Sequence, residues 1–145
     1  MTQTVRIDGL ADLNKKLLEL EPKLQRKTLG KALKKAGQPV LEESKRLVPV
    51  DSGRLRDALK LRSKGRSKKK PHRQSVSVAT PTRKQLKLRS DEKGYYPAVV
   101  EYGAAGRNIS ARPYLRPALA NQQDKVLATL KTELARGVLY AAKSQ

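Results

Sequence analysis

Pro49-Val50-Asp51-Ser52-Gly53-Arg54-Leu55 separates a leucine-striped stretch of the chain from a strongly basic one. Proline lacks a backbone N–H and disfavours helical backbone at the residue before it, so a helix that reaches Pro49 must end there. Asp51 or Ser52 can then cap a new helical turn, in which Leu55 and Leu59 share one face. We therefore predict a structural corner formed by Pro49, Asp51, Ser52 and Gly53.

The residues before this corner have the spacing of two amphipathic helices. Leucines recur every three or four positions from Leu10 to Leu24, which is typical of one helical face. Because proline is favoured in a first helical turn, we expect one helix to end near Glu21 and the next to begin at Pro22. Apolar and polar residues alternate over residues 4–8, which predicts a short strand before the first helix.

The residues after the corner predict strands and then a last helix. Period-two alternation over residues 59–62, 75–79 and 85–89 indicates three half-buried strands. Pro113 and Pro117 suit a helix start, and an apolar face that begins with Leu119 continues towards the C-terminus. The expected fold is α+β, a small mixed or antiparallel sheet of about four strands packed by long N-terminal helices and a long C-terminal helix. At 145 residues, we expect a single domain over residues 1–145.

The charge of the chain is concentrated in its middle. The formal net charge is +20, and residues 60–93 hold 13 of the 33 lysines and arginines but only two of the 13 acidic residues. Residues 63–74 contain no apolar side chain except that of Pro71, so we expect a mobile, solvated basic loop there. Because so much like charge repels itself, an anionic or oligomeric partner is expected.

Three interpretations of the basic loop remain open. Its cations can neutralise phosphates without distinguishing bases, pair with an acidic partner protein, or simply remain solvated. Residues 60–93 contain no aromatic side chain on which bases could stack. The residues predicted to contact phosphates or an acidic partner are Lys64, Arg66, Lys68, Lys69, Lys70 and Arg73.

The side chains needed for catalysis or metal binding are scarce. The chain has no cysteine, and its one histidine, His72, lies in the basic loop without a carboxylate at ligand spacing. Glu42 and Glu43 are interpreted as a solvated helix face. We therefore expect no enzyme, no metal and no cofactor. No apolar run approaches the roughly 18 residues of a membrane span, and no signal-peptide core is present, so we expect a soluble, unprocessed protein.

Glu101 is an acid set among apolar residues in the stretch from Tyr95 to Gly103. An acid in this position either points to solvent beside the glycine or meets a basic partner. Arg112 and Arg116 lie close in sequence and are the candidate partners. Both interpretations remain open.

Three blocks of sequence occur in order along the chain. They are Gly9-Leu10 with the leucine-striped helices, the corner at 49–55, and Tyr96-x-Ala98-x-x-Glu101-Tyr102-Gly103 leading to Ala111-Arg112-Pro113-Tyr114-Leu115-Arg116-Pro117-Ala118-Leu119. Together they resemble the neck proteins of tailed phages, namely the tail-completion or head–tail joining proteins of long-tailed phages. The chain departs from that pattern at Ala104, where a threonine is common, and in its long basic middle.

The resemblance implies a structural α+β protein without a cofactor, which assembles as a ring, commonly of six subunits. Its partners would be further copies of itself, the tail tube protein and the head connector or head-closure protein, around the passage for DNA. Its place would be the virion neck, at the tail end that faces the head, after assembly in the host cytoplasm. We place the subunit or partner interface at Glu101, Tyr102, Gly103, Arg112, Pro113, Tyr114 and Arg116.

A free-standing basic protein that contacts nucleic-acid phosphates non-specifically is the alternative. The sequence pI of about 10.5 supports it. Such proteins usually present a recognisable module or a basic helix, whereas here the excess charge lies in a loop. That distribution favours the ring.

Overall fold

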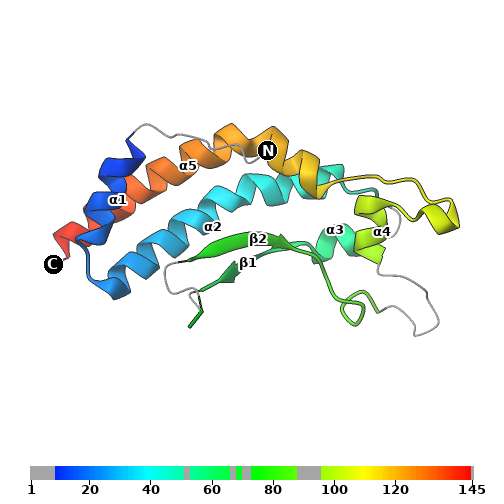
Figure 1. Ribbon diagram of the computed structural model, residues 1–145, viewed down its shortest axis with the longest axis horizontal. Helices are drawn as coiled ribbons and strands as arrows, with labels where there is room; N and C mark the ends of the chain where they lie inside the picture. The colour runs from blue at the N-terminus through cyan, green and yellow to red at the C-terminus, as the bar shows by residue number, and fades with distance from the viewer. Residues whose placement is uncertain (1–8, 51–52, 66–67, 70–72, 88–95, 145) are drawn as a thin grey trace. The chain divides into compact units, whose positions relative to one another are not determined.

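Two compact units make up the computed structural model, which describes residues 9–50, 53–65, 68–69, 73–87 and 96–144 (Figure 1). The helical unit comprises Met1–Ala36, Ser63–Ser75 and Asp124–Gln145, and the mixed unit comprises Gly37–Arg62 and Val76–Gln123. Two long helices, α2 (Pro22–Leu47) and α5 (Leu115–Lys143), contribute residues to both units.

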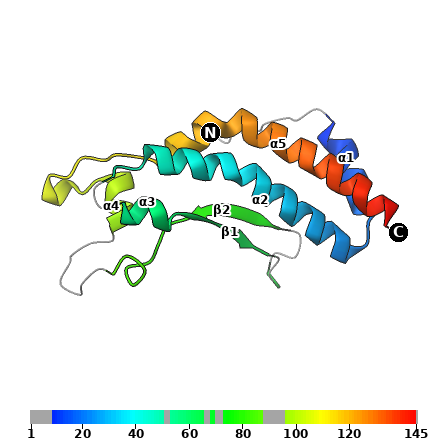
Figure 2. The ribbon, with the colours of Figure 1, turned by 180° about the vertical axis from the view of Figure 1, so that it is seen from behind.

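The helical unit is held together by leucine packing. Helix α1 (Leu10–Leu18) lies beside the first part of α2 and the last part of α5 in both views (Figures 1 and 2). The buried cluster of the helical unit consists of Leu17, Leu20, Val138 and Ala141, with Leu24 and Leu29 packed against it. Burial of apolar surface stabilises the folded state by about 25 cal/mol per Å², so the burial of this cluster holds the three helices together. Helix α2 begins at Pro22 as predicted, whereas α1 ends at Leu18, earlier than expected.

A glycine sets the spacing of α2 and α5 within the helical unit. A Cβ atom at Gly137 would lie 2.6 Å from Cγ2 of Thr28. Carbon atoms do not approach so closely, and the side chain of Thr28 is buried and β-branched, with few rotamers to retreat into. The close approach of the two helices therefore depends on the missing side chain at Gly137.

The mixed unit combines a sheet with helices. Strands β1 (Lys60–Lys64) and β2 (Ser75–Ala79) form a two-stranded antiparallel sheet, and α3 (Arg54–Ala58) and α4 (Tyr96–Tyr102) are short helices. Helix α2 approaches the sheet at Gly37, where an added Cβ would lie 3.2 Å from Cδ2 of Leu61. The buried cluster of this unit consists of Leu41, Val48, Leu55, Leu59 and Tyr114.

The corner after α2 separates that helix from a second, short helix, as predicted. Helix α2 ends at Leu47, two residues before Pro49, and α3 begins at Arg54. Gly53 occupies the N-cap of α3 with left-handed backbone (φ 73°), a conformation that glycine adopts without steric cost. Arg54 also donates a 3.0 Å hydrogen bond from Nη1 to the carbonyl oxygen of Leu86. The capping roles predicted for Asp51 and Ser52 fall outside the described residues.

The sheet is smaller than predicted. The strand predicted at 75–79 is confirmed with the same bounds, and the one predicted at 59–62 is confirmed as 60–64. Residues 83–87 form a turn, so the prediction of a strand at 85–89 is wrong. The backbone N–H of Leu86 donates to Thr82 O at 3.0 Å, and Lys87 has a positive φ of 53°. The predicted strand at 4–8 lies outside the described residues. Within the described residues the sheet has two strands instead of about four.

Helix α5 begins close to the predicted proline pair, with Pro117 in its first turn. Its buried face differs in part from the expected one. Leu119 is 56% exposed, whereas the neighbouring Ala118 is fully buried. Later in the helix Leu134 and Val138 are buried, as the periodicity predicted.

Candidate functional site

Glu101 lies on α4, a helix that the sequence pattern did not predict. Val100 on the same helix packs against the buried cluster of the mixed unit. The helix ends at Tyr102 and is followed by Gly103, whose φ of 74° is typical of a glycine after a helix C-terminus. The N–H of Gly103 donates to Val99 O at 2.7 Å. This placement leaves Glu101 only 2% exposed.

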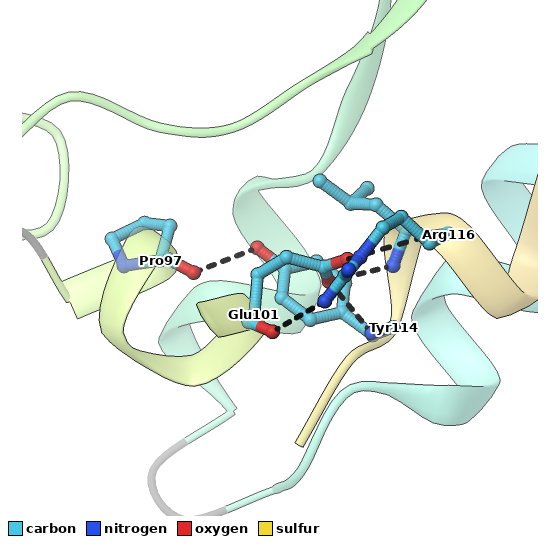
Figure 3. Close-up of polar contacts among 5 residues, drawn as sticks. Pro97, Glu101, Tyr114 and Arg116 are labelled. Atoms are coloured by element: carbon cyan, nitrogen blue, oxygen red, sulfur yellow. Dashed lines mark hydrogen bonds and ion pairs between the residues drawn. The ribbon is translucent and has the colours of Figure 1, made fainter. Parts of the chain in front are cut away.

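The carboxylate of Glu101 caps the start of α5 (Figure 3). One oxygen, Oε2, accepts hydrogen bonds from the N–H of Tyr114 at 2.8 Å and of Leu115 at 3.0 Å. The other, Oε1, accepts from the N–H of Arg116 at 3.3 Å and from its Nε at 3.0 Å. The first N–H groups of a helix have no partner within the helix, and its positive dipole end attracts an anion. A side chain from another element thus satisfies three N–H groups at once.

These contacts decide the charge of Glu101. Burial raises the pKa of the carboxyl, but hydrogen bonds from the N–H of Leu115, the N–H of Tyr114 and the side chain and N–H of Arg116 outweigh it, so the pKa is lowered. Donors that bind the charged form of a carboxyl favour that form. Glu101 is therefore an ionised, fully hydrogen-bonded group at neutral pH and a poor proton donor or acceptor.

Tyr114 and Arg116 differ in their exposure to solvent. Tyr114 is fully buried, and its hydroxyl lies 3.5 Å from the carbonyl oxygen of Pro97. The Arg116 side chain is 63% exposed, and its guanidinium lies 5.1 Å from the centre of the Tyr102 ring, within the range of a cation–π contact. Tyr102 is itself exposed. The site therefore presents an arginine stacked on a tyrosine at the surface, above a buried anchor.

The segment between α4 and α5, residues 104–112, forms an exposed arm, visible in yellow in Figure 1. Ala104 and Ile109 pair as an antiparallel bridge, with hydrogen bonds of 2.9 and 3.1 Å, and a 3-10 turn (Ala105–Arg107) closes the tip. At its base, the N–H of Arg112 donates to Val100 O at 2.8 Å. Residues 105–113 are all exposed, including the apolar Ile109 at 43%. The arm is therefore held by hydrogen bonds at both ends, and the residues between those ends are exposed to a partner.

Gly103 is required at the base of the arm. A Cβ at this position would lie 2.8 Å from both Ala111 N and Ile109 O, which are backbone atoms that cannot rotate away. Its positive φ adds strain for any other residue. The backbone at residues 109–111 therefore occupies the space that a side chain at position 103 would need.

The structure brings together most of the residues predicted for the interface. Glu101, Tyr102, Gly103, Tyr114 and Arg116 meet at the base of the arm, and the ion pair of Glu101 is made with Arg116. Arg112 takes part through its backbone, while its side chain and Pro113 are exposed. The role of all seven residues in contacts between subunits stays a prediction.

The residues of the basic loop are placed only in part. Lys64 ends β1, and Lys68, Lys69 and Arg73 are exposed. Arg66 and Lys70 lie outside the described residues. The loop belongs to the helical unit, which holds 19 of the 33 basic and six of the 13 acidic side chains, a net charge of +13 out of +20.

Sequence reasoning missed a second buried carboxylate. Glu43 was interpreted as part of a solvated face, which is correct for Glu42 but wrong for Glu43, which is buried. It accepts hydrogen bonds from Arg46 at 2.6 and 2.9 Å and from Asn121 at 3.2 Å. The hydrogen bonds from Arg46 and then Asn121 lower its pKa to about 2. The i, i+3 spacing of Glu43 and Arg46 was the available signal.

The described residues contain neither a metal-binding cluster nor a membrane-spanning helix. No group of three histidine, aspartate or glutamate side chains is arranged there to hold a metal ion. None of the helices in those same ranges has both the length and the apolar character to cross a membrane.

Comparison with known families gives one match. A family model described as "Bacteriophage HK97-gp10, putative tail-component" matches residues 11–103, more than half of the chain. The matched range contains the corner at 49–55 and Glu101, and it ends at Gly103 at the base of the arm. Comparisons with curated proteins and with solved structures gave no match.

Proposed function

Because this chain belongs to the HK97-gp10-like family of phage tail components, we propose that it completes the tail and joins it to the head connector as a closed ring around the DNA passage. The ring has six subunits. Its partners are further copies of the chain, the tail tube protein on one face, and the head connector or head-closure protein on the other.

The arm at residues 104–112 is the observation that carries this proposal. Binding orders flexible segments at a cost in entropy, and a segment already fixed in its bound form avoids most of that cost. The arm is fixed by the Ala104–Ile109 bridge, the Arg112 N–H and the Glu101 cap. It also exposes Ile109, an apolar residue suited to a pocket on a neighbour.

An arm that inserts into a different surface of the next subunit makes a head-to-tail contact. Contacts of this kind generate rings when the rotation between neighbours closes. The Arg116 guanidinium stacked on Tyr102 lies at the base of the arm, where tyrosine and arginine commonly supply binding energy between proteins. The contact would therefore combine Ile109 at its centre with Tyr102 and Arg116 near its edge.

Native mass spectrometry of the purified chain tests the proposal. Ile109→Asp places a charge in the contact and should convert rings into monomers. Leu139→Asp is the matched control, since Leu139 is also an exposed apolar residue but lies on α5 in the helical unit. Rings that survive Ile109→Asp, or that are lost equally in the control, would contradict the role of the arm.

Non-specific DNA contact through the basic loop is a second candidate function. The exposed Lys68, Lys69 and Arg73 within a unit of charge +13 favour it. Each phosphate contact contributes roughly 0.9 to the slope of log affinity against log salt concentration, so Lys68→Glu with Lys69→Glu should reduce that slope by about 2. Lys16→Glu with Lys34→Glu, on exposed helix positions, is the control of equal charge. An unchanged slope for the loop variant would remove this candidate.

A further inference from the structure

The helical unit contains a groove between α2 and α5 that the proposed function does not use. Its volume is about 390 Å³, a size usual for binding pockets. The lining residues come from the first part of α2 and the last part of α5. They are Leu24, Lys27, Thr28, Lys31, Ala32, Lys35, Glu133, Arg136, Gly137, Tyr140, Ala141 and Ser144.

The groove has an apolar floor. Ala32 and Ala141 are buried there, and Leu24 is partly buried beside them. The absence of a side chain at Gly137 brings the two helices close together beneath it. Tyr140 stands at the edge and is 76% exposed. A large aromatic residue left this exposed beside an apolar floor is typical of a surface that a protein segment covers.

The rim of the groove is basic and has a regular repeat. Lys27, Lys31 and Lys35 follow one another at intervals of four residues along α2 and are all exposed. Four residues of helix advance about 6 Å, so these ammonium groups recur once per turn on one side of the floor. A second helix with carboxylates at the same interval matches this repeat, because both helices have the same rise. Among the described residues, Lys27 and Lys31 make no ion pair with a carboxylate.

The lining of the groove distinguishes between possible ligands. The carboxylate of Glu133 is already paired, because it lies 3.0 Å from Nζ of Lys35 and 3.2 Å from Nη1 of Arg136. Its side chain is only 17% exposed. A phosphate backbone has no apolar group that could cover the floor at Ala32 and Ala141. A protein segment can place its acids against Lys27 and Lys31 and an apolar residue over the floor. The groove therefore fits a protein better than a phosphate backbone.

We propose that this groove binds an acidic amphipathic helix of a partner protein. The carboxylates of that helix lie one turn apart against Lys27 and Lys31, and its apolar face covers Ala32 and Ala141 beside Tyr140. Binding of an amphipathic helix in a groove is a common mode of peptide recognition. The inference stands on the helical unit alone and does not require ring formation.

A designed peptide provides the probe. It is an 18-residue fluorescent helix with glutamates at three successive turns and leucines on the adjoining face, compared with the same peptide carrying glutamine in place of glutamate. Fluorescence anisotropy should show that the acidic peptide binds, and that Lys27→Glu with Lys31→Glu weakens binding about tenfold. Tyr140→Ala should also weaken it, because it removes the apolar edge of the groove.

A variant with the same change of charge outside the groove is the control. Lys34→Glu with Lys125→Glu changes the net charge equally at exposed positions outside the lining, and should leave binding within about twofold, since general attraction between exposed charges is weak in salt. Circular dichroism should show unchanged helix content in all variants. The proposal is overturned if the acidic peptide does not bind, or if the two charge variants weaken it equally. It is also overturned if a thymidine oligonucleotide of equal charge binds more tightly and loses affinity in the Lys27, Lys31 variant.

Discussion

The backbone N–H of Tyr114 lies 2.8 Å from the buried carboxylate of Glu101, 13 residues earlier in the chain. This contact joins the end of α4 to the start of α5 and so closes the base of the arm at residues 104–112. One carboxylate satisfies the first N–H groups of a long helix and fixes the ends of an exposed segment. Helix capping and presentation of the arm therefore depend on the same residue.

Replacement of Glu101 should cost far more stability than replacement of its ionic partner. Glu101→Gln puts an amide N–H against N–H donors and leaves buried groups unsatisfied, which costs about 2 kcal/mol in the free energy of unfolding. Arg116→Gln removes a largely exposed partner and should cost less than about 1 kcal/mol. Urea unfolding of both variants measures the difference. Equal losses would show that the ion pair, and not the cap, supplies the stability.

Acid should destabilise the mixed unit through its two buried carboxylates. Hydrogen bonds from Arg46 and Asn121 hold the pKa of Glu43 at about 2, below the ordinary 4.5, and the pKa of Glu101 is also lowered. A lowered pKa in the folded state gives stability that is complete above 4.5 and is lost as the pH falls towards the folded value. For Glu43 the loss falls between pH 4.5 and about 2.

The contribution of Glu43 can be separated from that of other carboxylates. Urea unfolding of the unchanged chain and of Glu43→Gln, measured from pH 6 to pH 3, should give a shallower pH dependence in the variant. The variant loses a group that binds a proton only on unfolding over this range. Parallel curves would mean that the Glu43 pKa is the same in the folded and unfolded chain.

Gly103 and Gly106 should respond differently to the same substitution. Gly103→Ala forces a Cβ to within 2.8 Å of two backbone atoms at a positive φ and should destabilise by about 2 kcal/mol. Gly106 lies in the same arm with nothing within 4 Å of an added Cβ, so Gly106→Ala should be nearly neutral. Thermal unfolding compares the two. A neutral Gly103→Ala would contradict the close return of the arm past this glycine.

Gly137 and Thr28 should show strong coupling. Gly137→Ala improves helix propensity by about 1 kcal/mol, but its Cβ meets the Thr28 methyl carbon at 2.6 Å, and overpacking of this kind costs about 1–3 kcal/mol. Net destabilisation is expected, and Thr28→Ser, which removes that methyl group, should make Gly137→Ala stabilising.

A control for this pair lies on α2. Gly30 has nothing within 4 Å of an added Cβ, so Gly30→Ala should stabilise by about 1 kcal/mol through helix propensity alone. Double-mutant analysis of the free energies of unfolding measures the coupling. Additive effects of Gly137→Ala and Thr28→Ser would show that the two residues do not touch.

Local sequence signals predicted the elements whose limits are set by local chemistry. Pro22 begins α2 because proline suits a first helical turn, and α2 ends two residues before Pro49, although Pro39 lies inside the same helix. The period-two stretch at 75–79 is a strand as expected. The stretch at 85–89 has the same alternation, but residues up to Lys87 form a turn, in which Arg54 binds Leu86 O. The alternation of five residues cannot predict this contact, because Arg54 lies 32 residues earlier in the chain.

The ion pair of the candidate site was predictable from the sequence, but its helix cap was not. The sequence placed Glu101 near Arg116, since both flank one loop, and the ion pair is present. The cap that Glu101 forms on the N–H groups of Tyr114 and Leu115 was not predicted. Every residue except proline has a backbone N–H, so the residue types at these positions give no signal for it. The burial of Glu43 was missed because one of its partners, Asn121, lies 78 residues away.

The mass of the assembled protein tests the central claim most directly. Native mass spectrometry over a range of protein concentrations should show a closed six-subunit ring for the unchanged chain and for Leu139→Asp, and monomers for Ile109→Asp. A monomer at every concentration, or an open series of oligomers without a closed species, would contradict the ring. Intact rings of Ile109→Asp would contradict the arm as the contact that closes it.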